Sequence, residues 1–185
     1  MKSTRKHLNS VQLYNIAKLE GGYMTQRVDG EAILHLLAQN EQEVAKVYRH
    51  IAEDAKMGDI YFENMAKDED NHHKAYMKLA EQAKADGGWV VDADEYDFFR
   101  LRLERSLLAK PEELLEKAKK IRDKMEMFEL AERIERETVE IVRELQDIIP
   151  RFAPEELKII EREEKAHLKK VTERIRDNML NVRGM

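Results

Sequence analysis

The stretches 66–76 (AKDEDNHHKAY) and 161–170 (EREEKAHLKK) contain the same short pattern, a glutamate followed three residues later by a histidine. The two pairs are Glu69 with His72 and Glu164 with His167. Residues three apart on an α-helix project side by side, so each pair would present a carboxylate oxygen and an imidazole nitrogen to one point. One such pair is common on a charged helix surface, but two in a chain with six histidines suggest a common role.

Four long helices are predicted around these stretches from the spacing of apolar residues. Apolar side chains recur at the helical period of about 3.6 residues, and breakers are few, with 7 glycines and 3 prolines in the chain. Gly58 and Asp59 mark the turn between the first two helices, and Pro154 opens the last one. The helices are expected at residues 31–54, 59–85, 111–149 and 154–180, the third joining the core from about Met125.

The order of these helices predicts an all-α fold. Short turns join the first helix to the second and the third to the fourth, so each pair should be antiparallel. Residues 86–110 are expected to form a long crossover between the two pairs. Residues 1–30 form an N-terminal extension with a candidate short helix at 10–20 (SVQLYNIAKLE), and no segment is predicted to be a strand.

Each Glu-x-x-His pair has a partner glutamate on the preceding helix. Glu41 lies 28 residues before Glu69, and Glu135 lies 29 residues before Glu164. Residues equidistant from a turn reach the same height on two antiparallel helices, because each residue rises by about 1.5 Å. Both Glu41 and Glu135 also fall within the apolar stripe of their helices, so all four glutamates are expected to point inward at one level.

Six ionisable side chains should therefore converge inside one apolar core. They are Glu41, Glu69, His72, Glu135, Glu164 and His167. Four carboxylates in such a core need positive charge beside them, and two metal ions about 3.5–4 Å apart would supply it. The chain has no cysteine, so nitrogen and oxygen atoms alone would hold the ions. Glu41 and Glu135 are expected to bridge from one ion to the other.

The chain resembles the ferritin-like di-iron and di-manganese carboxylate proteins, in which two helices give one glutamate each and two give Glu-x-x-His. The stretches closest to the rubrerythrin branch are NEQEVAKVYRHIAED, YFENMAKDEDNHHKAYMKLAE, LAERIERETVEIVRELQ and EREEKAHLKKV. The likeness covers residues 31–85 and 125–176. It implies a ferritin-like four-helix bundle over residues 31–185, with the six side chains above as ligands and Tyr48 as a catalytic residue beside the metals.

The resemblance is incomplete in two respects that matter for function. Rubrerythrins carry a cysteine-bound rubredoxin domain that delivers electrons, and this chain has no cysteine, so an external electron donor is implied. Rubrerythrins also have an extra glutamate one turn after the ligand of the third helix, where this chain has Thr138. A homodimer is expected from the resemblance alone.

Two alternatives stay open in the choice of ligands. Asp70 and His73 form a second carboxylate and histidine frame next to the first one on the same helix. On the third helix, Glu137 could take the place of Glu135, in which case Glu140 would match the extra glutamate of the rubrerythrins.

The overall charge gives no indication of a nucleic acid or membrane partner. The formal net charge is -5 and the pI is near 5.8, and no block of lysine and arginine dominates the chain. A basic patch is the usual feature of proteins that bind nucleic acid or anionic membranes. No apolar run approaches the roughly 20 residues that cross a bilayer, and the N-terminus lacks an apolar signal core. These features predict a cytoplasmic protein.

The function expected from the sequence is that of a non-haem di-iron oxidoreductase that reacts with hydrogen peroxide or dioxygen. Two iron ions among carboxylates are readily oxidised and can deliver two electrons to one peroxide, while the Tyr48 hydroxyl could supply a hydrogen bond. Ferroxidase or iron-handling chemistry and a di-manganese catalase-like activity stay open, because the ligands do not separate iron from manganese. The non-catalytic alternative is a helical module that metal ions, such as zinc, merely stabilise.

Overall fold

A computed structural model describes residues 14–18, 24–53 and 60–183, and it is largely helical. The four long helices are α1 (Gly30–Glu53), α2 (Ile60–Ala85), α5 (Lys124–Ile148) and α6 (Pro154–Arg183). The shorter elements are β1 (Tyr14–Lys18), β2 (Met24–Val28), β3 (Trp89–Asp92), α3 (Ala93–Arg105), the 3₁₀ turn η1 (Leu107–Ala109) and α4 (Pro111–Ala118). None of the described helices is both long and apolar enough to cross a membrane.

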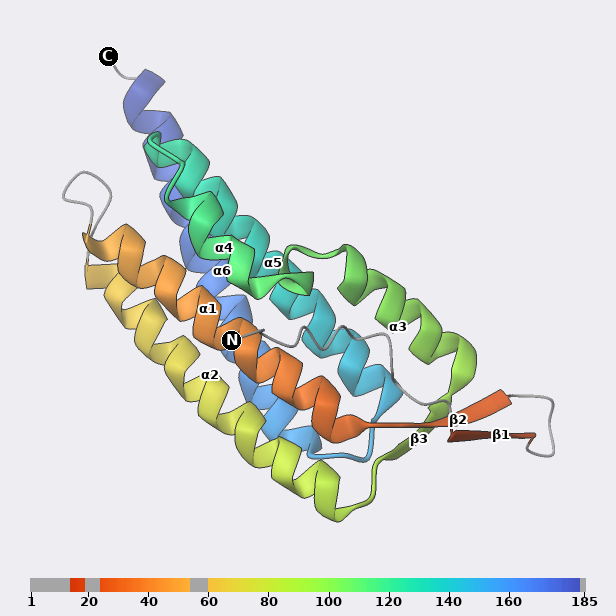
Figure 1. The fold of residues 1–185 in the computed structure, drawn as a ribbon. Helices are drawn as coiled ribbons and strands as arrows, with labels where there is room; N and C mark the ends of the chain where they lie inside the picture. Colours follow the sequence, from red (N-terminus) through yellow and green to blue (C-terminus); the bar gives the residue numbers. More distant parts are fainter. Residues whose placement is uncertain (1–13, 19–23, 54–59, 184–185) are drawn as a thin grey trace, which may run out of the picture.

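The long helices form two antiparallel pairs, α1 with α2 and α5 with α6 (Figure 1). Buried apolar side chains of both pairs belong to one continuous core. Asp29 begins α1 by accepting a hydrogen bond from the Ala32 backbone N–H at 3.0 Å, and α6 begins at Pro154 as predicted. The turn predicted at Gly58 and Asp59 lies outside the described residues.

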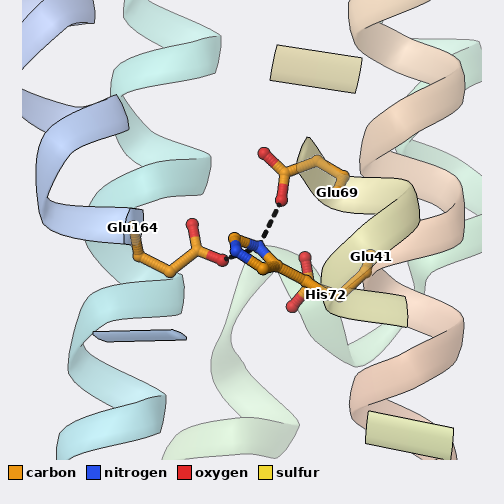
Figure 2. A group of neighbouring side chains, drawn as sticks. All are labelled: Glu41, Glu69, His72 and Glu164. Atoms are coloured by element: carbon orange, nitrogen blue, oxygen red, sulfur yellow. Dashed lines mark hydrogen bonds and ion pairs between the residues drawn. The ribbon is translucent and has the colours of Figure 1, made fainter. Parts of the chain in front are cut away.

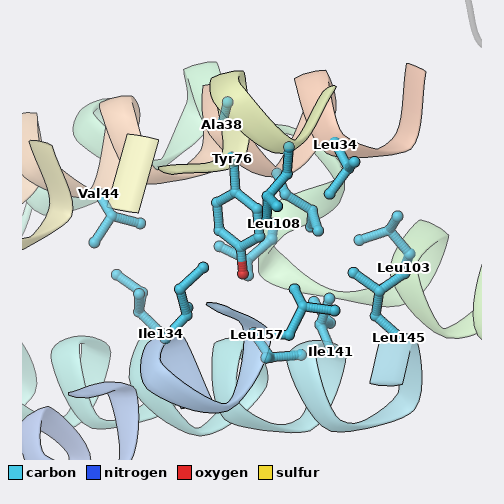
Figure 3. Packing of buried hydrophobic residues seen from close by; sticks show 14 of the residues in the cluster. Leu34, Ala38, Val44, Tyr76, Leu103, Leu108, Ile134, Ile141, Leu145 and Leu157 are labelled. Carbon is cyan, nitrogen blue, oxygen red and sulfur yellow. The ribbon is translucent and has the colours of Figure 1, made fainter. Parts of the chain in front are cut away.

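The core is layered along the helix axes. Its central level holds the four predicted ligand glutamates, one from each long helix. One layer of buried side chains lies on each side of this level. Each layer is seven residues away along every long helix, which is two turns and about 10 Å. One, the Phe62 layer, contains Tyr48, Phe62, Phe128 and Val171, and the other, the Tyr76 layer, contains Leu34, Tyr76, Val142 and Leu157. Figure 3 shows the Tyr76 ring extending from α2 toward Leu157 of α6. The glutamates are therefore enclosed between two apolar layers.

The segment between the two pairs covers part of their outer surface. Helix α4 packs on α1 and buries Leu114 and Ala118, while α3 packs on α5 and buries Phe99 and Leu103. Figure 1 shows α3 at the edge of the molecule farthest from α2. Within the part of the chain that the structure describes, no comparable element lies over α2 or α6.

The prediction of one helix over residues 111–149 is wrong, because residues 119–123 separate α4 from α5. Asp123 starts the new helix, with its side chain accepting hydrogen bonds from the backbone N–H groups of Met125 and Glu126. An aspartate at this position satisfies amide groups that have no partner within the helix. The predicted crossover at 86–110 contains β3, α3 and η1.

The prediction that the chain has no strand is wrong as well. Strands β1, β2 and β3 form an antiparallel sheet in that order, in which Val28 pairs with Trp89 and Thr25 with Asp92. Residues 14–18, the described part of the short helix expected at 10–20, form strand β1 instead. The strands are four or five residues long and β3 pairs with a segment distant in the sequence. Periodicity within one short segment does not reveal such pairing.

The end of α2 depends on two glycines with positive φ angles, 75° at Gly87 and 86° at Gly88. The Gly88 backbone N–H donates to the Ala83 carbonyl oxygen at 3.2 Å and completes the helix end. A Cβ atom on Gly88 would lie 2.6 Å from the Val28 carbonyl oxygen, whereas on Gly87 its nearest neighbour would be Arg27 Nη1 at 3.8 Å. Gly88 thus lets β2 approach the end of α2 closely.

We expect Gly88→Ala to lower the free energy of unfolding more than Gly87→Ala does. Both variants force alanine into the left-handed region, at a cost of about 1–2 kcal/mol. Only Gly88→Ala adds a clash with backbone, which we expect to cost about 1–3 kcal/mol more. Urea unfolding followed by far-ultraviolet circular dichroism measures both changes. Equal losses of stability in the two variants would contradict the close approach of β2.

Candidate metal centre

The six predicted ligand residues come together at the centre of the core. Helix α1 contributes Glu41, α2 contributes Glu69 and His72, α5 contributes Glu135, and α6 contributes Glu164 and His167. Each of the six is at most 3% exposed. Positions predicted from spacing and phase alone thus form one buried cluster, here called the carboxylate cluster.

The carboxylate cluster contains two groups of potential metal ligands. Glu41 and His72 belong to one group, Glu135 and His167 belong to the other, and Glu69 and Glu164 belong to both. Within each group, one ligand atom from every residue lies within 4.8 Å of the others. The structure therefore offers two adjacent metal positions that share two carboxylates.

The shared carboxylates face both histidines. Glu69 places Oε2 3.0 Å from His72 Nδ1 and Oε1 3.1 Å from His167 Nδ1. Glu164 places Oε1 2.7 Å from His72 Nδ1 and Oε2 3.6 Å from His167 Nδ1. Figure 2 shows the His72 ring between these two carboxylates, with Glu41 close by. Each oxygen of a shared carboxylate is thus directed to a different half of the site.

This arrangement differs from the predicted one in its bridging residues. The sequence favoured Glu41 and Glu135 as the carboxylates that reach from one ion to the other. In the structure Glu69 and Glu164 occupy that shared position, while Glu41 and Glu135 each belong to one group. The reason is geometric: α2 and α6 bring their glutamates between the two histidines, and spacing along single helices does not specify that relation.

Burial and the neighbouring charges shift the pKa values of the cluster in opposite directions. Burial raises the pKa of Glu41 well above its usual value, and the charges of Glu164 and Glu69 add to this rise. Burial likewise raises the pKa of Glu135, against the lowering effect of its close contact with His167. Burial alone would raise the pKa of Glu164, but its close contacts with His167 and His72 lower it to about 2.

The two histidines have raised pKa values for the complementary reason. Burial would lower the pKa of His72, but hydrogen bonds with Glu164 and Glu69 raise it to about 12. Contacts with Glu135, Glu164 and Glu69 raise the pKa of His167 strongly, also against the effect of burial. The raised pKa values of Glu41, Glu135 and both imidazoles all favour bound protons, which offset the buried negative charge. Two divalent cations would bring the same positive charge as those protons.

Several atoms of the cluster make no well-aligned hydrogen bond. They are Glu69 Oε1, Glu135 Oε2, Glu164 Oε1 and His167 Nδ1, all buried. A buried polar atom without a hydrogen bond is costly, so such atoms rarely gather in one place without a ligand. Oxygen and nitrogen atoms that converge on a common point without bonding well to one another are suited to hold cations. The residues present therefore fit a pair of metal ions.

Two acidic residues that the prediction missed contact the outer nitrogens of the histidines. Glu163 Oε2 of α6 lies 3.0 Å from His72 Nε2 of α2, and Asp68 Oδ2 of α2 lies 3.2 Å from His167 Nε2 of α6. A carboxylate that accepts a hydrogen bond from Nε2–H leaves the Nδ1 lone pair directed at the cluster, the form that binds a metal. A sequence signal existed, because each residue directly precedes the glutamate of a Glu-x-x-His pair.

Two buried tyrosines lie on either side of the carboxylate cluster. The Tyr48 hydroxyl donates a hydrogen bond to Glu135 Oε1, which places Tyr48 beside the site as predicted. Burial raises the pKa of Tyr48, and the charge of Glu135 raises it further. The Tyr76 hydroxyl makes no hydrogen bond to any described residue. Burial raises its pKa too, followed by the charges of Glu41, Glu164 and Glu69.

The alternative ligands all lie outside both groups. Glu137 accepts a hydrogen bond from the Leu107 backbone N–H, and Glu140 pairs with Arg102 of α3. His73 donates Nδ1–H to the Ala38 carbonyl oxygen at 2.8 Å, and Asp70 pairs with Arg49. Thr138 Oγ1 donates to the Ile134 carbonyl oxygen within α5. Apart from Thr138, these side chains tie helices or turns to one another.

Comparison with known proteins finds no matching protein family, no similar curated protein and no similar solved structure. What the chain does must therefore be argued from the site itself.

We expect substitutions of shared and unshared glutamates to differ in the number of metal ions lost. Glu41 belongs to one ligand group, so Glu41→Gln should remove one of two ions per chain. Glu69 belongs to both groups, so Glu69→Gln should remove both ions or nearly both. Glutamine has nearly the same size as glutamate, so each variant removes charge without opening a large cavity. Element-resolved metal content after loading with iron(II) under anaerobic conditions measures the outcome.

Glu135→Gln serves as the matched control for Glu41→Gln, because it lies in the other group. Each of these two variants should keep about one ion, in line with two positions. Loss of both ions in Glu41→Gln together with retention of one in Glu69→Gln would contradict the shared role of Glu69.

Proposed function

We propose that this protein is a ferritin-like four-helix bundle that holds two iron ions and reduces hydrogen peroxide or dioxygen with electrons from an external donor. The observation that carries the proposal is the pair of ligand groups that share Glu69 and Glu164. A structural metal site needs one closed set of ligands, whereas two adjacent positions with common carboxylates suit a reaction that moves two electrons at once.

The kinds of ligand support iron or manganese over zinc. The cluster offers four carboxylates and two imidazoles to two positions, and the chain has no thiolate. Structural zinc is almost always held by four ligands in which cysteine and histidine dominate. Hard carboxylate oxygens suit manganese, and together with imidazole they suit iron. Manganese is therefore the alternative metal, with catalase-like activity as the matching reaction.

Two bound iron ions would supply the electrons that reduce the oxidant. The residues of the chain then have separate tasks: Glu69 and Glu164 hold both positions together, and Glu41 and Glu135 each complete one of them. The Phe62 layer and the Tyr76 layer keep bulk water from the site on both sides along the helix axes. Exclusion of water strengthens every charge interaction within the site.

Tyr48 acts on Glu135 rather than on a metal position directly. Its hydroxyl donates to Glu135 Oε1, and its raised pKa keeps the proton on the phenol. The hydrogen bond fixes the carboxylate of Glu135 in one orientation and holds a proton next to the site. Such a proton is needed when an O–O bond is reduced, because each product oxygen must gain protons.

We expect the iron-loaded protein to consume hydrogen peroxide when a small-molecule reductant replaces the natural donor. Each peroxide takes up two electrons and two protons and yields two waters. Peroxide loss and reductant oxidation, followed together, should agree at one peroxide per two electrons. The zinc-loaded protein is the control, since zinc has no redox chemistry.

Three other results would each lead to a different function. A protein that holds two irons but consumes no oxidant would be a metal-stabilised helical module. Rapid oxidation of added iron(II) without turnover of a reductant would indicate a ferroxidase. Release of dioxygen from peroxide by the manganese-loaded protein, without any reductant, would indicate a catalase-like enzyme.

Tyr48→Phe should slow peroxide turnover by about tenfold or more, since a hydrogen bond to a charged group contributes about 1.5–3 kcal/mol. The metal content should stay at the wild-type level, because the variant removes no ligand. Tyr76→Phe is the matched control: it removes an equally buried hydroxyl that has no hydrogen bond among the described residues. Equal losses of turnover in both variants would show that the contact between Tyr48 and Glu135 has no special role.

A further inference from the structure

The carboxylate cluster is closed on most sides. The Phe62 layer and the Tyr76 layer close it along the helix axes, and all eight side chains of these layers are buried. Helix α4 covers α1 and α3 covers α5 on the outer surface. A metal ion needs a way into this site, and helices α4 and α3 cover parts of α1 and α5.

The line along which α2 and α6 face each other, here called the seam, has no such cover among the described residues. Here the rings of His72 and His167 stand next to each other, with centroids 5.8 Å apart, and they form the wall of the cluster. Outside this wall lie Asp68 and Glu163, whose side chains are each 48% exposed. They are the acidic side chains that contact a cluster histidine and also reach solvent among the described residues.

We propose that metal ions reach the site through the seam between α2 and α6, where Asp68 and Glu163 bind the ion first and the two histidine rings open to admit it. This inference rests on the proposed metal site. Asp68 stands on α2 and Glu163 on α6, so each of the two helices places one exposed carboxylate at the seam. Directly behind the rings lie buried oxygens without a well-aligned hydrogen bond, among them Glu69 Oε1 and Glu164 Oε1, which can receive the ion.

The same contacts couple capture of the ion to opening of the wall. Asp68 and Glu163 accept hydrogen bonds from the outer nitrogens of His167 and His72. A cation bound by these carboxylates competes for the oxygens that hold the rings, so its arrival frees a ring to turn. Once the ion has passed inward, the carboxylates are available again to accept Nε2–H and hold the rings in the ligand orientation.

The test measures the rate of metal uptake by the full-length chain after metal has been removed with a chelator. Cobalt(II) is the probe, because its visible absorption changes when carboxylate and imidazole ligands replace water. Stopped-flow mixing gives the uptake rate constant, and transfer to excess chelator gives the release rate constant. The variant Asp68→Asn/Glu163→Gln removes both charges but keeps an oxygen that can accept the hydrogen bond from each histidine.

We expect this double variant to take up cobalt at least about tenfold more slowly, in the range by which charged clefts raise association rates. Glu63→Gln/Glu173→Gln is the matched control. It removes two exposed charges from the same two helices at positions that contact neither histidine, and it should keep the wild-type rate. The single variants Asp68→Asn and Glu163→Gln should give intermediate rates if both carboxylates take part.

Two results would overturn the proposal, and they are distinguishable. In the first, the double variant has the wild-type uptake rate constant and binds cobalt more weakly only because its release rate constant is larger. That result would mean that the two carboxylates hold the histidine rings and take no part in capturing the ion. A wild-type chain that binds no cobalt would refute the metal site itself, and with it the proposed function.

Discussion

Four carboxylates buried in one apolar core can persist only with positive charge beside them. Much of the structure serves this requirement. Two histidines enter the core with the glutamates, and their pKa values rise because the carboxylates surround them. The apolar layers two turns away on either side increase the requirement, since they keep out the water that would otherwise stabilise the charges. Cations and protons compete for the same place, so the cluster is prepared for metal even when protons fill that role.

Helices α2 and α6 hold the site in a reciprocal way. Each gives a glutamate that faces both histidines, and each gives an outer carboxylate that holds the histidine of the other helix. Neither helix can move without disturbing ligands on its partner. By contrast, α1 and α5 each give one glutamate to one position. The two halves of the site are therefore alike in chemistry: both depend on α2 and α6, and they differ in whether α1 or α5 completes them.

The site could be predicted from the sequence because it obeys the geometry of single helices and simple turns. Glu41 and Glu135 lay at the right height and phase, and the structure places them in the cluster. Asp68 and Glu163 were missed because an acidic residue on a charged helix looks like ordinary surface until its neighbour across the seam is known. The strands were missed for a related reason, since β3 gains its structure from β2, a segment distant in sequence. Contacts between segments, rather than patterns within them, account for both failures.

The split of the cluster between two helix pairs has a consequence for how the chain folds. Contacts within each pair join residues close in sequence and can form early, whereas those that bring Glu69 to Glu164 must close a loop of more than ninety residues. The ligands on α1 and α2 alone form neither group completely, because both groups need Glu164 of α6. A newly made chain would therefore acquire its full ligand set only when the two hairpins dock, at a late stage of folding.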